Sequence, residues 1–320
     1  MFKVVITDST FPNIEPERRI LEPAGCEMVL GKIGPERELI ELTRDADAII
    51  TQFAKLTPNV IAHMRKVKVI VRNGIGYDNI DVDAARKHEI PVCNIPDYCI
   101  DEVADQTLAC ILALTRQVIP NHNLVRDGRW GLAAREDQMR TLKEMTAGVV
   151  GFGRIGRAVV KRLLGFNGRV VVADPFVPDE AIRAAGAEPV SLDSLFSSAD
   201  LITLHCLLNA QTWHLVNSQS LAKMKPGVYI INVGRGGLVD TDALIAALKN
   251  GHVAAAGLDV FEQEPLPQDS PLRTMENVIA ASHIASVSPR AMKTARETSA
   301  QLVLKGLRGE KLENVVNGVI

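Results

Sequence analysis

Three polar side chains stand just after apolar runs in the second half of the sequence, and their types suit acid–base chemistry on a carboxylic acid. Arg235 follows YIINVG, Glu264 follows AAGLDVFEQ, and His283 follows NVIAAS. An arginine keeps its charge and offers a planar fork of donors to a carboxylate. A histidine can give and take a proton near neutral pH, and a carboxylate beside it can orient it. Taken singly, each residue also has an ordinary interpretation as a solvated loop residue or a residue at the edge of the core.

A glycine-rich turn and a downstream aspartate have the spacing of a dinucleotide-binding site. Gly151, Gly153 and Gly156 form G-x-G-x-x-G between an apolar run and a helical pattern, and Asp174 follows the next apolar run. Such glycines permit a tight turn in which a pyrophosphate approaches backbone N–H groups at a helix N-terminus. Asp174 would accept hydrogen bonds from the adenosine ribose hydroxyls and repel a 2′-phosphate, which favours NAD over NADP. The alternative is a glycine turn that serves packing alone.

Short apolar runs alternate with helical patterns along most of the chain, and these elements must position the polar groups. Continuous apolar strands separated by helices indicate parallel βαβ units covered on both faces. Ligands bind at the carboxyl ends of such strands, so residues that follow neighbouring strands can converge. We expect two open parallel sheets in series, with a polar, irregular stretch at 121–145. Strands are expected at 3–8, 46–51, 67–72, 90–95, 147–153, 168–175, 200–206, 227–234, 253–261 and 277–283, and helices at 35–44, 57–66, 81–88, 101–118, 154–165, 191–197, 217–223 and 241–249.

The composition is that of a globular protein and disfavours nucleic-acid binding and membrane insertion. A length of 320 residues suggests two domains, and 36 basic against 38 acidic side chains give a net charge of −2. That balance, with no basic run, argues against nucleic acid as a partner. No apolar run reaches the roughly 18 residues that a membrane span needs. The sequence starts on a strand-like run, so we expect no signal peptide, and the five cysteines are scattered. We therefore expect a cytoplasmic protein with reduced thiols and no metal.

Five motifs, in order along nearly the whole chain, resemble those of the D-isomer specific 2-hydroxyacid dehydrogenase family. VRNGIGYDNIDVDAA (71–85) looks like the loop that binds the substrate carboxylate, and VVGFGRIG with ADP looks like the NAD turn. INVGRGGLVD, GLDVFEQEP (257–265) and SHIAS (282–286) are similar to the segments that carry the catalytic arginine, glutamate and histidine. The resemblance implies an NAD-dependent oxidoreductase that interconverts a D-2-hydroxy acid and its 2-oxo acid by hydride transfer.

The resemblance also assigns roles to the polar residues. Arg235 would clamp the substrate carboxylate and polarise the 2-oxo group. His283 would give its proton to the carbonyl oxygen during reduction and remove it during oxidation. Glu264 would hydrogen-bond His283 and stabilise its protonated form. The catalytic set is thus Arg235, Glu264 and His283, and the substrate-binding set is Gly74, Ile75, Gly76 and Arg235.

On the cofactor side, the resemblance implies contacts along the whole dinucleotide. Arg154 and Ile155 would lie at the pyrophosphate, and Val233 and Asp259 beside the nicotinamide. Asp259 would accept a hydrogen bond from the carboxamide, with a structural loop carboxylate as the alternative. The full cofactor-binding set is Ile75, Gly151, Gly153, Arg154, Ile155, Gly156, Asp174, Cys206, Leu207, Thr212, Val233, Gly234, Asp259, His283 and Ala285.

The fold implied by the resemblance is α/β, with two parallel-sheet domains. A Rossmann NAD-binding domain (100–285) would be inserted in a flavodoxin-like substrate domain (1–99 with 286–320). The family pairs its NAD-binding domains through the segment that matches 101–145, so we expect a homodimer. The apolar stripe of 101–118 is compatible with that interface, but it suits intramolecular core equally well.

Several positions depart from the family pattern and leave other functions open. Thr51 stands where many phosphoglycerate dehydrogenases have an arginine, which disfavours 3-phosphoglycerate as a substrate without excluding it, since we expect Lys55 and Arg72 to lie nearby. GYDNID and VCNIPDYCIDEVADQTL look closest to the C-terminal-binding-protein branch of the family. The alternative function is therefore an NAD(H)-sensing, corepressor-like binding protein with incidental turnover. A formate dehydrogenase is disfavoured because those enzymes have glutamine in place of Glu264, whereas a phosphite dehydrogenase would share much of the site.

Overall fold

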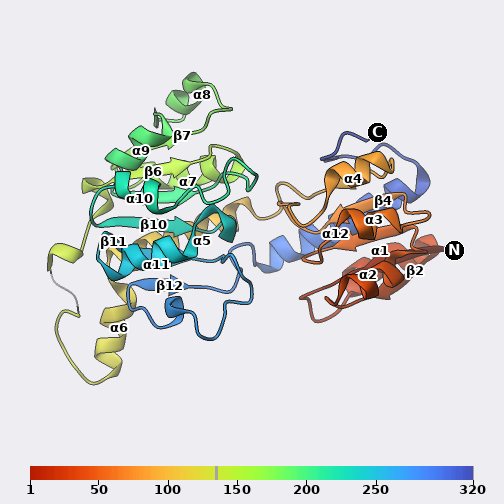
Figure 1. The fold of residues 1–320 in the computed structure, drawn as a ribbon, viewed down its shortest axis with the longest axis horizontal. Helices are drawn as coiled ribbons and strands as arrows, with labels where there is room; N and C mark the ends of the chain where they lie inside the picture. The colour runs from red at the N-terminus through yellow and green to blue at the C-terminus, as the bar shows by residue number, and fades with distance from the viewer. Residues whose placement is uncertain (134–135, 320) are drawn as a thin grey trace. The chain divides into compact units, whose positions relative to one another are not determined.

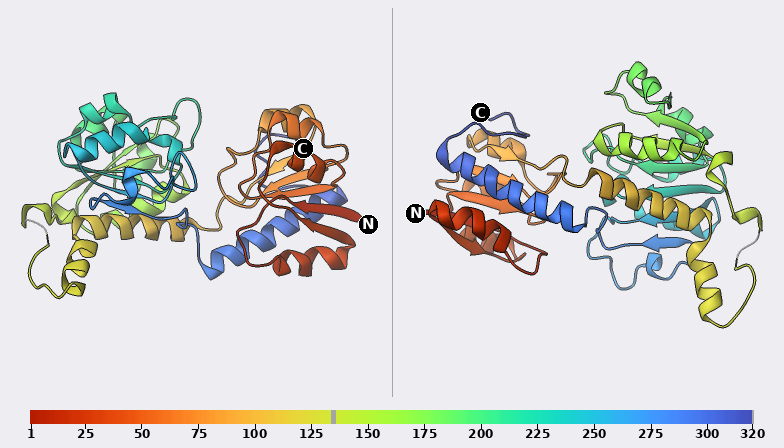
Figure 2. Two further views of the ribbon diagram at one scale, coloured as in Figure 1. Left: turned by 60° about the horizontal axis from the view of Figure 1, so that its bottom comes forward. Right: turned by 180° about the vertical axis from the view of Figure 1, so that it is seen from behind.

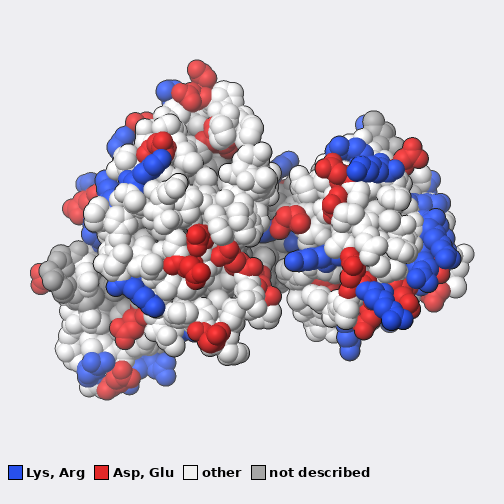
Figure 3. Space-filling view, in the orientation of Figure 1, with Lys and Arg blue, Asp and Glu red and all other residues white. Residues whose placement is uncertain are grey.

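The chain folds into two compact units, each with its own parallel sheet. The structure is a computed structural model that describes residues 1–133 and 136–319. Unit 1 comprises Met1–Tyr98 and Ser288–Ile320, and unit 2 comprises Cys99–Val287 (Figure 1). Within the described residues, no helix has both the length and the apolar character needed to cross a membrane. On the face of unit 2 drawn in Figure 3, acidic and basic side chains are interspersed among uncharged ones.

Unit 1 contains a five-stranded sheet in the order β2-β1-β3-β4-β5, and all its pairings are parallel. This is the flavodoxin-like order, so the predicted fold of this unit is confirmed. Helices α1 and α12 cover one face, and α2, α3 and α4 cover the other (Figures 1 and 2). Apolar clusters fill both interfaces, as a parallel sheet requires. The elements are β1 (Phe2–Ile6), α1 (Glu15–Leu21), β2 (Cys26–Leu30), α2 (Glu36–Thr43), β3 (Ala48–Thr51), α3 (Pro58–Ala62), β4 (Val69–Arg72), α4 (Val82–Lys87), β5 (Val92–Cys93) and α12 (Pro289–Arg308).

Unit 2 contains a seven-stranded parallel sheet in the order β12-β11-β10-β9-β6-β7-β8. Six of these strands, β8-β7-β6-β9-β10-β11, have the 3-2-1-4-5-6 order of the Rossmann fold, which confirms the prediction. Helices α5 and α7 pack together on one face, and α9, α10 and α11 lie on the other (Figures 1 and 2). The elements are α5 (Ile100–Thr115), α6 (Val118–Arg126), β6 (Thr146–Val150), α7 (Arg154–Leu164), β7 (Arg169–Ala173), α8 (Asp179–Ala184), β8 (Glu188–Pro189), α9 (Leu192–Ser198), β9 (Leu201–Leu204), α10 (Ser218–Lys223), β10 (Val228–Asn232), α11 (Thr241–Lys249), β11 (Val253–Leu258) and β12 (Val278–Ala280).

Two expectations about the secondary structure were wrong. The helix predicted at 101–118 ends at Thr115, because Gln117 adopts a left-handed backbone conformation (φ 53°) that no α-helix can continue through. A second helix, α6, then begins, so the stretch expected to be irregular from 121 is helical as far as Arg126. Residues 134–135 of that stretch lie outside the described residues. The sequence analysis did not predict α1, α8 or β8. Helices α1 and α8 contain few apolar residues, and β8 has only two residues.

A buried ion pair joins the C-terminal helix α12 to α1 within unit 1. Arg296 donates from Nε to Oε1 of Glu17 (2.7 Å) and from Nη2 to Oε2 (2.6 Å). The same guanidinium donates to the carbonyl of Asn13 and lies over the ring of Phe11, 4.7 Å from its centroid. Both charged side chains are almost fully buried, so each charge is stabilised by the other residue instead of by water. This pair ties the returning end of the chain to its beginning.

We expect Arg296→Met to destabilise unit 1 by about 3–5 kcal/mol, because it leaves the Glu17 carboxylate buried without its partner. The matched control is Lys293→Met, one turn earlier on α12, where an exposed pair with Glu297 (3.9 Å) should contribute less than about 1 kcal/mol. Denaturant unfolding of both variants measures the difference. Equal stabilities of the two variants would show that the buried pair adds nothing.

Candidate active site

The three predicted catalytic residues follow the carboxyl ends of three neighbouring strands of unit 2. Strand β10 ends at Asn232, β11 at Leu258 and β12 at Ala280, and the three strands are adjacent and parallel. Arg235, Glu264 and His283 therefore leave the sheet at the same edge. Glu264 and His283 are in direct contact, and the charge of Arg235 contributes to lowering the pKa of Glu264.

Glu264 and His283 form a hydrogen-bonded pair. Oε2 of Glu264 lies 2.8 Å from Nδ1 of His283, and Oε1 accepts the backbone N–H of Phe261 at 2.9 Å. Burial alone would raise the pKa of Glu264, but the bond and charge of His283, with Phe261 and Arg235, together hold that pKa below its ordinary value. Glu264 is therefore a carboxylate at neutral pH. Because Nδ1 of His283 contacts this carboxylate, Nε2 is the ring atom expected to take part in proton transfer.

Arg235 sits in a turn that the end of β10 holds in place. The buried Asn232 donates from Nδ2 to the carbonyl of Arg235 (2.8 Å) and accepts the N–H of Gly234 at Oδ1 (3.1 Å). Nη1 of Arg235 donates to the carbonyl of Gly234 at 2.9 Å. Asn232 was not among the predicted site residues. Its position, as the one amide side chain that ends an apolar run directly before the turn, is the sequence signal that could have identified it.

Asp259 is buried and holds the backbone that carries His283. Its oxygens accept the N–H groups of Ile284 (2.9 Å) and Ala285 (2.8 Å), and its carbonyl accepts the N–H of His283 at 2.8 Å. Burial raises the pKa of Asp259, and the two N–H donors counteract that rise. Asp259 therefore fixes the loop that follows β12. The nicotinamide contact predicted for it, and those for Ala285 and the buried Val233, stay predictions.

The glycine turn after β6 fits a dinucleotide. A Cβ at Gly151 would overlap the backbone at His205 and Cys206, and one at Gly156 would overlap the carbonyl of Gly151, so packing requires both glycines. A Cβ at Gly153, in contrast, would meet nothing within 4 Å. Gly153 is the N-cap of α7, whose first turn includes Arg154 and Ile155. An open glycine at a helix N-terminus is what the approach of a pyrophosphate requires, so these residues suit the diphosphate of NAD.

Asp174 follows β7, next to the glycine turn. Its Oδ2 accepts the N–H of Phe152 (2.7 Å), and its Oδ1 accepts the N–H of Phe176 (2.9 Å). These bonds fix the carboxylate at the end of β7, and each oxygen keeps a lone pair for a ribose hydroxyl. The guanidinium of Arg157 lies over the ring of Phe152, 4.3 Å from its centroid.

The loop after β9 carries three further predicted cofactor contacts. The hydroxyl of Thr212 donates to the carbonyl of Leu207 (2.6 Å) and accepts the N–H of Asn209 (2.8 Å), so this side chain closes the loop. Leu207 is exposed. Burial raises the pKa of the Cys206 thiol to about 11, so it is a neutral, unreactive thiol at physiological pH. The structure thus shows how this loop is shaped, and its contacts with the cofactor remain predictions.

The predicted carboxylate-binding loop belongs to unit 1. The carbonyl of Gly74 accepts the N–H of Ile95 (3.0 Å), and the carbonyl of Ile75 accepts from Nδ2 of Asn94 (2.7 Å). Within the described part of the chain, the N–H groups of Ile75 and Gly76 donate to no residue. A loop with fixed carbonyls and available N–H groups suits an anionic ligand.

Thr51, the position at which many phosphoglycerate dehydrogenases have an arginine, belongs to unit 1. Thr51 is fully buried, and its hydroxyl bonds to Thr7 at 2.9 Å, so it is part of the core of unit 1 rather than a ligand. Among the described residues, no group of three or more histidine, cysteine or acidic side chains could hold a metal ion.

Comparison with known proteins places these features in a family. Residues 108–285 match the family model for the NAD binding domain of D-isomer specific 2-hydroxyacid dehydrogenases. A protein named D-3-phosphoglycerate dehydrogenase from Methanocaldococcus jannaschii is 40% identical over 99% of this chain and 60% of its own length. The chain thus spans less than two thirds of that relative. A glyoxylate reductase from Thermococcus litoralis is 39% identical over 89% of this chain and 88% of its own length.

A solved structure shows the same architecture. The D-lactate dehydrogenase of Aquifex aeolicus, in complex with NAD and lactic acid, has a TM-score of 0.87 and 31% sequence identity, and 96% of each chain is covered. The family match and this relative confirm the Rossmann NAD-binding domain and NAD as its cofactor.

The different surroundings of the three glycines generate a test of the cofactor site. We expect Gly153→Ala to keep the stability of the wild type but to weaken NADH binding about 10-fold or more, because the added methyl group occupies the space that the pyrophosphate needs. Gly156→Ala should instead destabilise unit 2, since its Cβ would meet the backbone. NADH fluorescence titration and thermal unfolding separate the two effects. Unchanged NADH affinity in Gly153→Ala would contradict this assignment.

Proposed function

The chain belongs to the D-isomer specific 2-hydroxyacid dehydrogenase family, and from that premise we propose that it interconverts a D-2-hydroxy acid and its 2-oxo acid with NAD(H). The observation that carries the proposal is the hydrogen bond between Glu264 and Nδ1 of His283, at the strand ends where Arg235 also emerges. An imidazole held by an ionised carboxylate is an acid–base group, and an arginine beside it recognises a carboxylic acid.

In the reductive direction, each residue has a distinct task. Arg235 binds the substrate carboxylate through its guanidinium fork, which orients the 2-oxo group toward His283. NADH, when bound, supplies the hydride that reduces C2. His283 delivers a proton from Nε2 to the carbonyl oxygen, and Glu264 stabilises the imidazolium before that transfer. In the oxidative direction, the neutral imidazole takes the proton back.

We propose a 2-oxo acid without a phosphate group as the substrate class. The position expected to differ from phosphoglycerate dehydrogenases, Thr51, is buried and hydrogen-bonded within the core of unit 1. Lys55, the first basic residue after Thr51 in the chain, is exposed. The relatives named as glyoxylate reductases support a small 2-oxo acid. The catalytic names of these relatives do not favour the alternative of a corepressor-like sensor.

NADH oxidation with a panel of 2-oxo acids tests this function, with NADPH in parallel. We expect turnover on the order of 1–1000 per second with at least one acid. NADH should be preferred because the Asp174 carboxylate repels a 2′-phosphate. Tight NADH binding without turnover of any acid would overturn the proposal in favour of a binding protein.

Two substitutions test the acid–base pair. His283→Ala should lower kcat for reduction by about 10²–10⁴-fold with NADH binding nearly intact. Glu264→Gln removes a carboxylate whose pKa is held low, and therefore a charge that is present throughout the working pH range. Because reduction uses the imidazolium, the rate of reduction in Glu264→Gln should decline at a lower pH than in the wild type. An unchanged pH profile, or normal turnover in His283→Ala, would contradict the mechanism.

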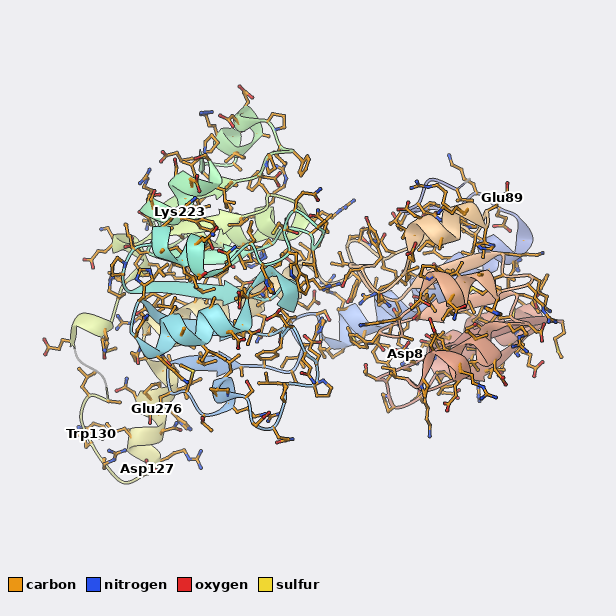
Figure 4. The ribbon with its side chains drawn as sticks, viewed as in Figure 1. Asp8, Glu89, Asp127, Trp130, Lys223 and Glu276 are labelled. Carbon is orange, nitrogen blue, oxygen red and sulfur yellow. The ribbon has the colours of Figure 1, made fainter. Side chains whose placement is uncertain are left out.

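We further propose that the protein is a homodimer that pairs through helix α6 and the loop after it. None of the nine residues of α6 is buried, although Val118, Ile119 and Val125 are apolar. Trp130, on the following loop, is 92% exposed (Figure 4). A helix this short is only marginally stable without packing, so a second copy of the chain is the proposed cover.

Val118→Asp should convert the dimer to a monomer in sedimentation velocity, because a carboxylate is costly to bury in an apolar interface. Ile33→Asp, at a residue 66% exposed in unit 1, is the control and should leave the oligomeric state unchanged. A wild-type monomer would overturn this part of the proposal.

A further inference from the structure

A second histidine–glutamate pair lies in unit 2, close in sequence to the proposed acid–base pair. Nε2 of His214 is 2.6 Å from Oε1 of Glu262, which precedes Glu264 by two positions. His214 lies in the loop between β9 and α10, two positions after Thr212. The two residues are 48 positions apart in the chain, so the bond joins two separate loops.

His214 contacts both Gly237 and Trp213. Its backbone N–H donates to the carbonyl of Gly237 at 2.8 Å, and its ring stacks on Trp213 with centroids 4.6 Å apart. Its backbone is left-handed, with φ 50°, a conformation that costs energy in a residue other than glycine. The contacts of the ring and of the backbone N–H offset that cost.

Glu262 extends the connection to the next helix. Its Oε2 accepts the N–H of Thr241, the first residue of α11, at 2.7 Å. Burial alone would raise the pKa of Glu262, but the hydrogen bonds from Thr241 and His214 lower it overall. The ionised carboxylate therefore connects the start of α11 with the loop of His214.

The glycines after Arg235 show how closely these loops pack. A Cβ at Gly236 would overlap the backbone of Phe261, and a Cβ at Gly237 would overlap the ring of Trp213. The turn of Arg235 is therefore in direct contact with the segment that leads to Glu264 and with the residue beside His214. A shift of either loop would move this turn.

We infer that His214 and Glu262 are positioning residues for the reaction proposed above, on which this inference rests. Their bond keeps the turn of Arg235, the segment of Glu264 and the loop of residues 207–212 in one arrangement. Among the described residues, the charged groups that face the His214 ring are Glu262 and Asp240, whose Oδ2 lies 4.0 Å from Nδ1. Neither member of the pair is required to touch the substrate.

Two variants test the pair in the whole 320-residue chain, with NADH and the best 2-oxo acid of the panel. His214→Asn tolerates the left-handed backbone but is too short to reach Glu262, and Glu262→Ala removes the carboxylate. Each should lower kcat about 10- to 100-fold, on the scale of a misplacement of about 1 Å, with a smaller change in KM. The matched control is Glu188→Ala, which removes an exposed pair with Arg169 (2.8 Å) at the β7–β8 edge and should leave kcat unchanged.

Glu262→Gln distinguishes positioning from simple loss of stability. Its amide oxygen can accept the N–H of Thr241 while its NH₂ donates to an unprotonated Nε2 of His214, so the bridge survives only with a neutral ring. Its kcat relative to the wild type should be close to one at about pH 8. The ratio should fall toward about pH 5.5, across the range in which an imidazole takes up a proton. A merely structural role would give a ratio that does not change with pH.

The outcomes separate this inference from the proposed function. A wild type that turns over no 2-oxo acid overturns both. A wild type that turns over, together with a folded His214→Asn or Glu262→Ala of normal kcat, overturns only the positioning role. If these two variants do not fold, a pH-independent kcat ratio in Glu262→Gln has the same consequence.

Discussion

The parallel alignment of the strands in unit 2 is the constraint on which the rest of the site depends. Because every strand runs in the same direction, the segments that follow β10, β11 and β12 all leave the sheet at one edge. Residues separated by as many as 48 positions, Arg235 and His283, thereby come within electrostatic range of one carboxylate. No local interaction along the chain could produce that convergence.

Backbone contacts at this edge are as important to the proposed site as its three proposed catalytic side chains. The side chain of Asn232 holds the turn of Arg235 with one donated and one accepted hydrogen bond, and the side chain of Asp259 accepts two N–H groups of the backbone just after His283. Both are buried polar groups with their hydrogen-bonding capacity used by the neighbouring loop, and such groups rigidify a site. The turn of Arg235 approaches the backbone of Phe261 so closely at Gly236 that no side chain would fit there. The proposed catalytic groups are thus carried by loops that hydrogen bonds and close contacts hold in place, which favours catalysis by orientation.

Two carboxylates of one short segment have different tasks because their surroundings differ. Glu264 faces His283 and belongs to the proposed proton-transfer pair, whereas Glu262 faces His214 and the start of α11. For each of the two glutamates, burial alone would raise the pKa, but hydrogen-bond donors and nearby positive charges lower it by more. The sequence motif GLDVFEQEP contains both residues but does not distinguish them.

The sequence by itself determined the elements whose signals are local. The apolar runs predicted the strands, and the spacing of Gly151, Gly153 and Gly156 predicted the dinucleotide turn, because the burial of a strand on both faces and the sterics of a tight turn are both encoded within a few residues. The family resemblance supplied the candidates Arg235, Glu264 and His283. Their spatial convergence, however, was an inference from strand direction until the strand order was known.

Only the tertiary structure decided which partner each polar side chain has. Arg296 pairs with Glu17 across 279 positions, and His214 pairs with Glu262 across 48, and no period or motif encodes such distances. The break at Gln117 and the hydrogen-bond partners of Asp259, the N–H groups of Ile284 and Ala285, also emerged only in the folded chain. The physical reason is that a buried polar group is stable with whichever partner the packing brings to it, and packing is a property of the whole unit.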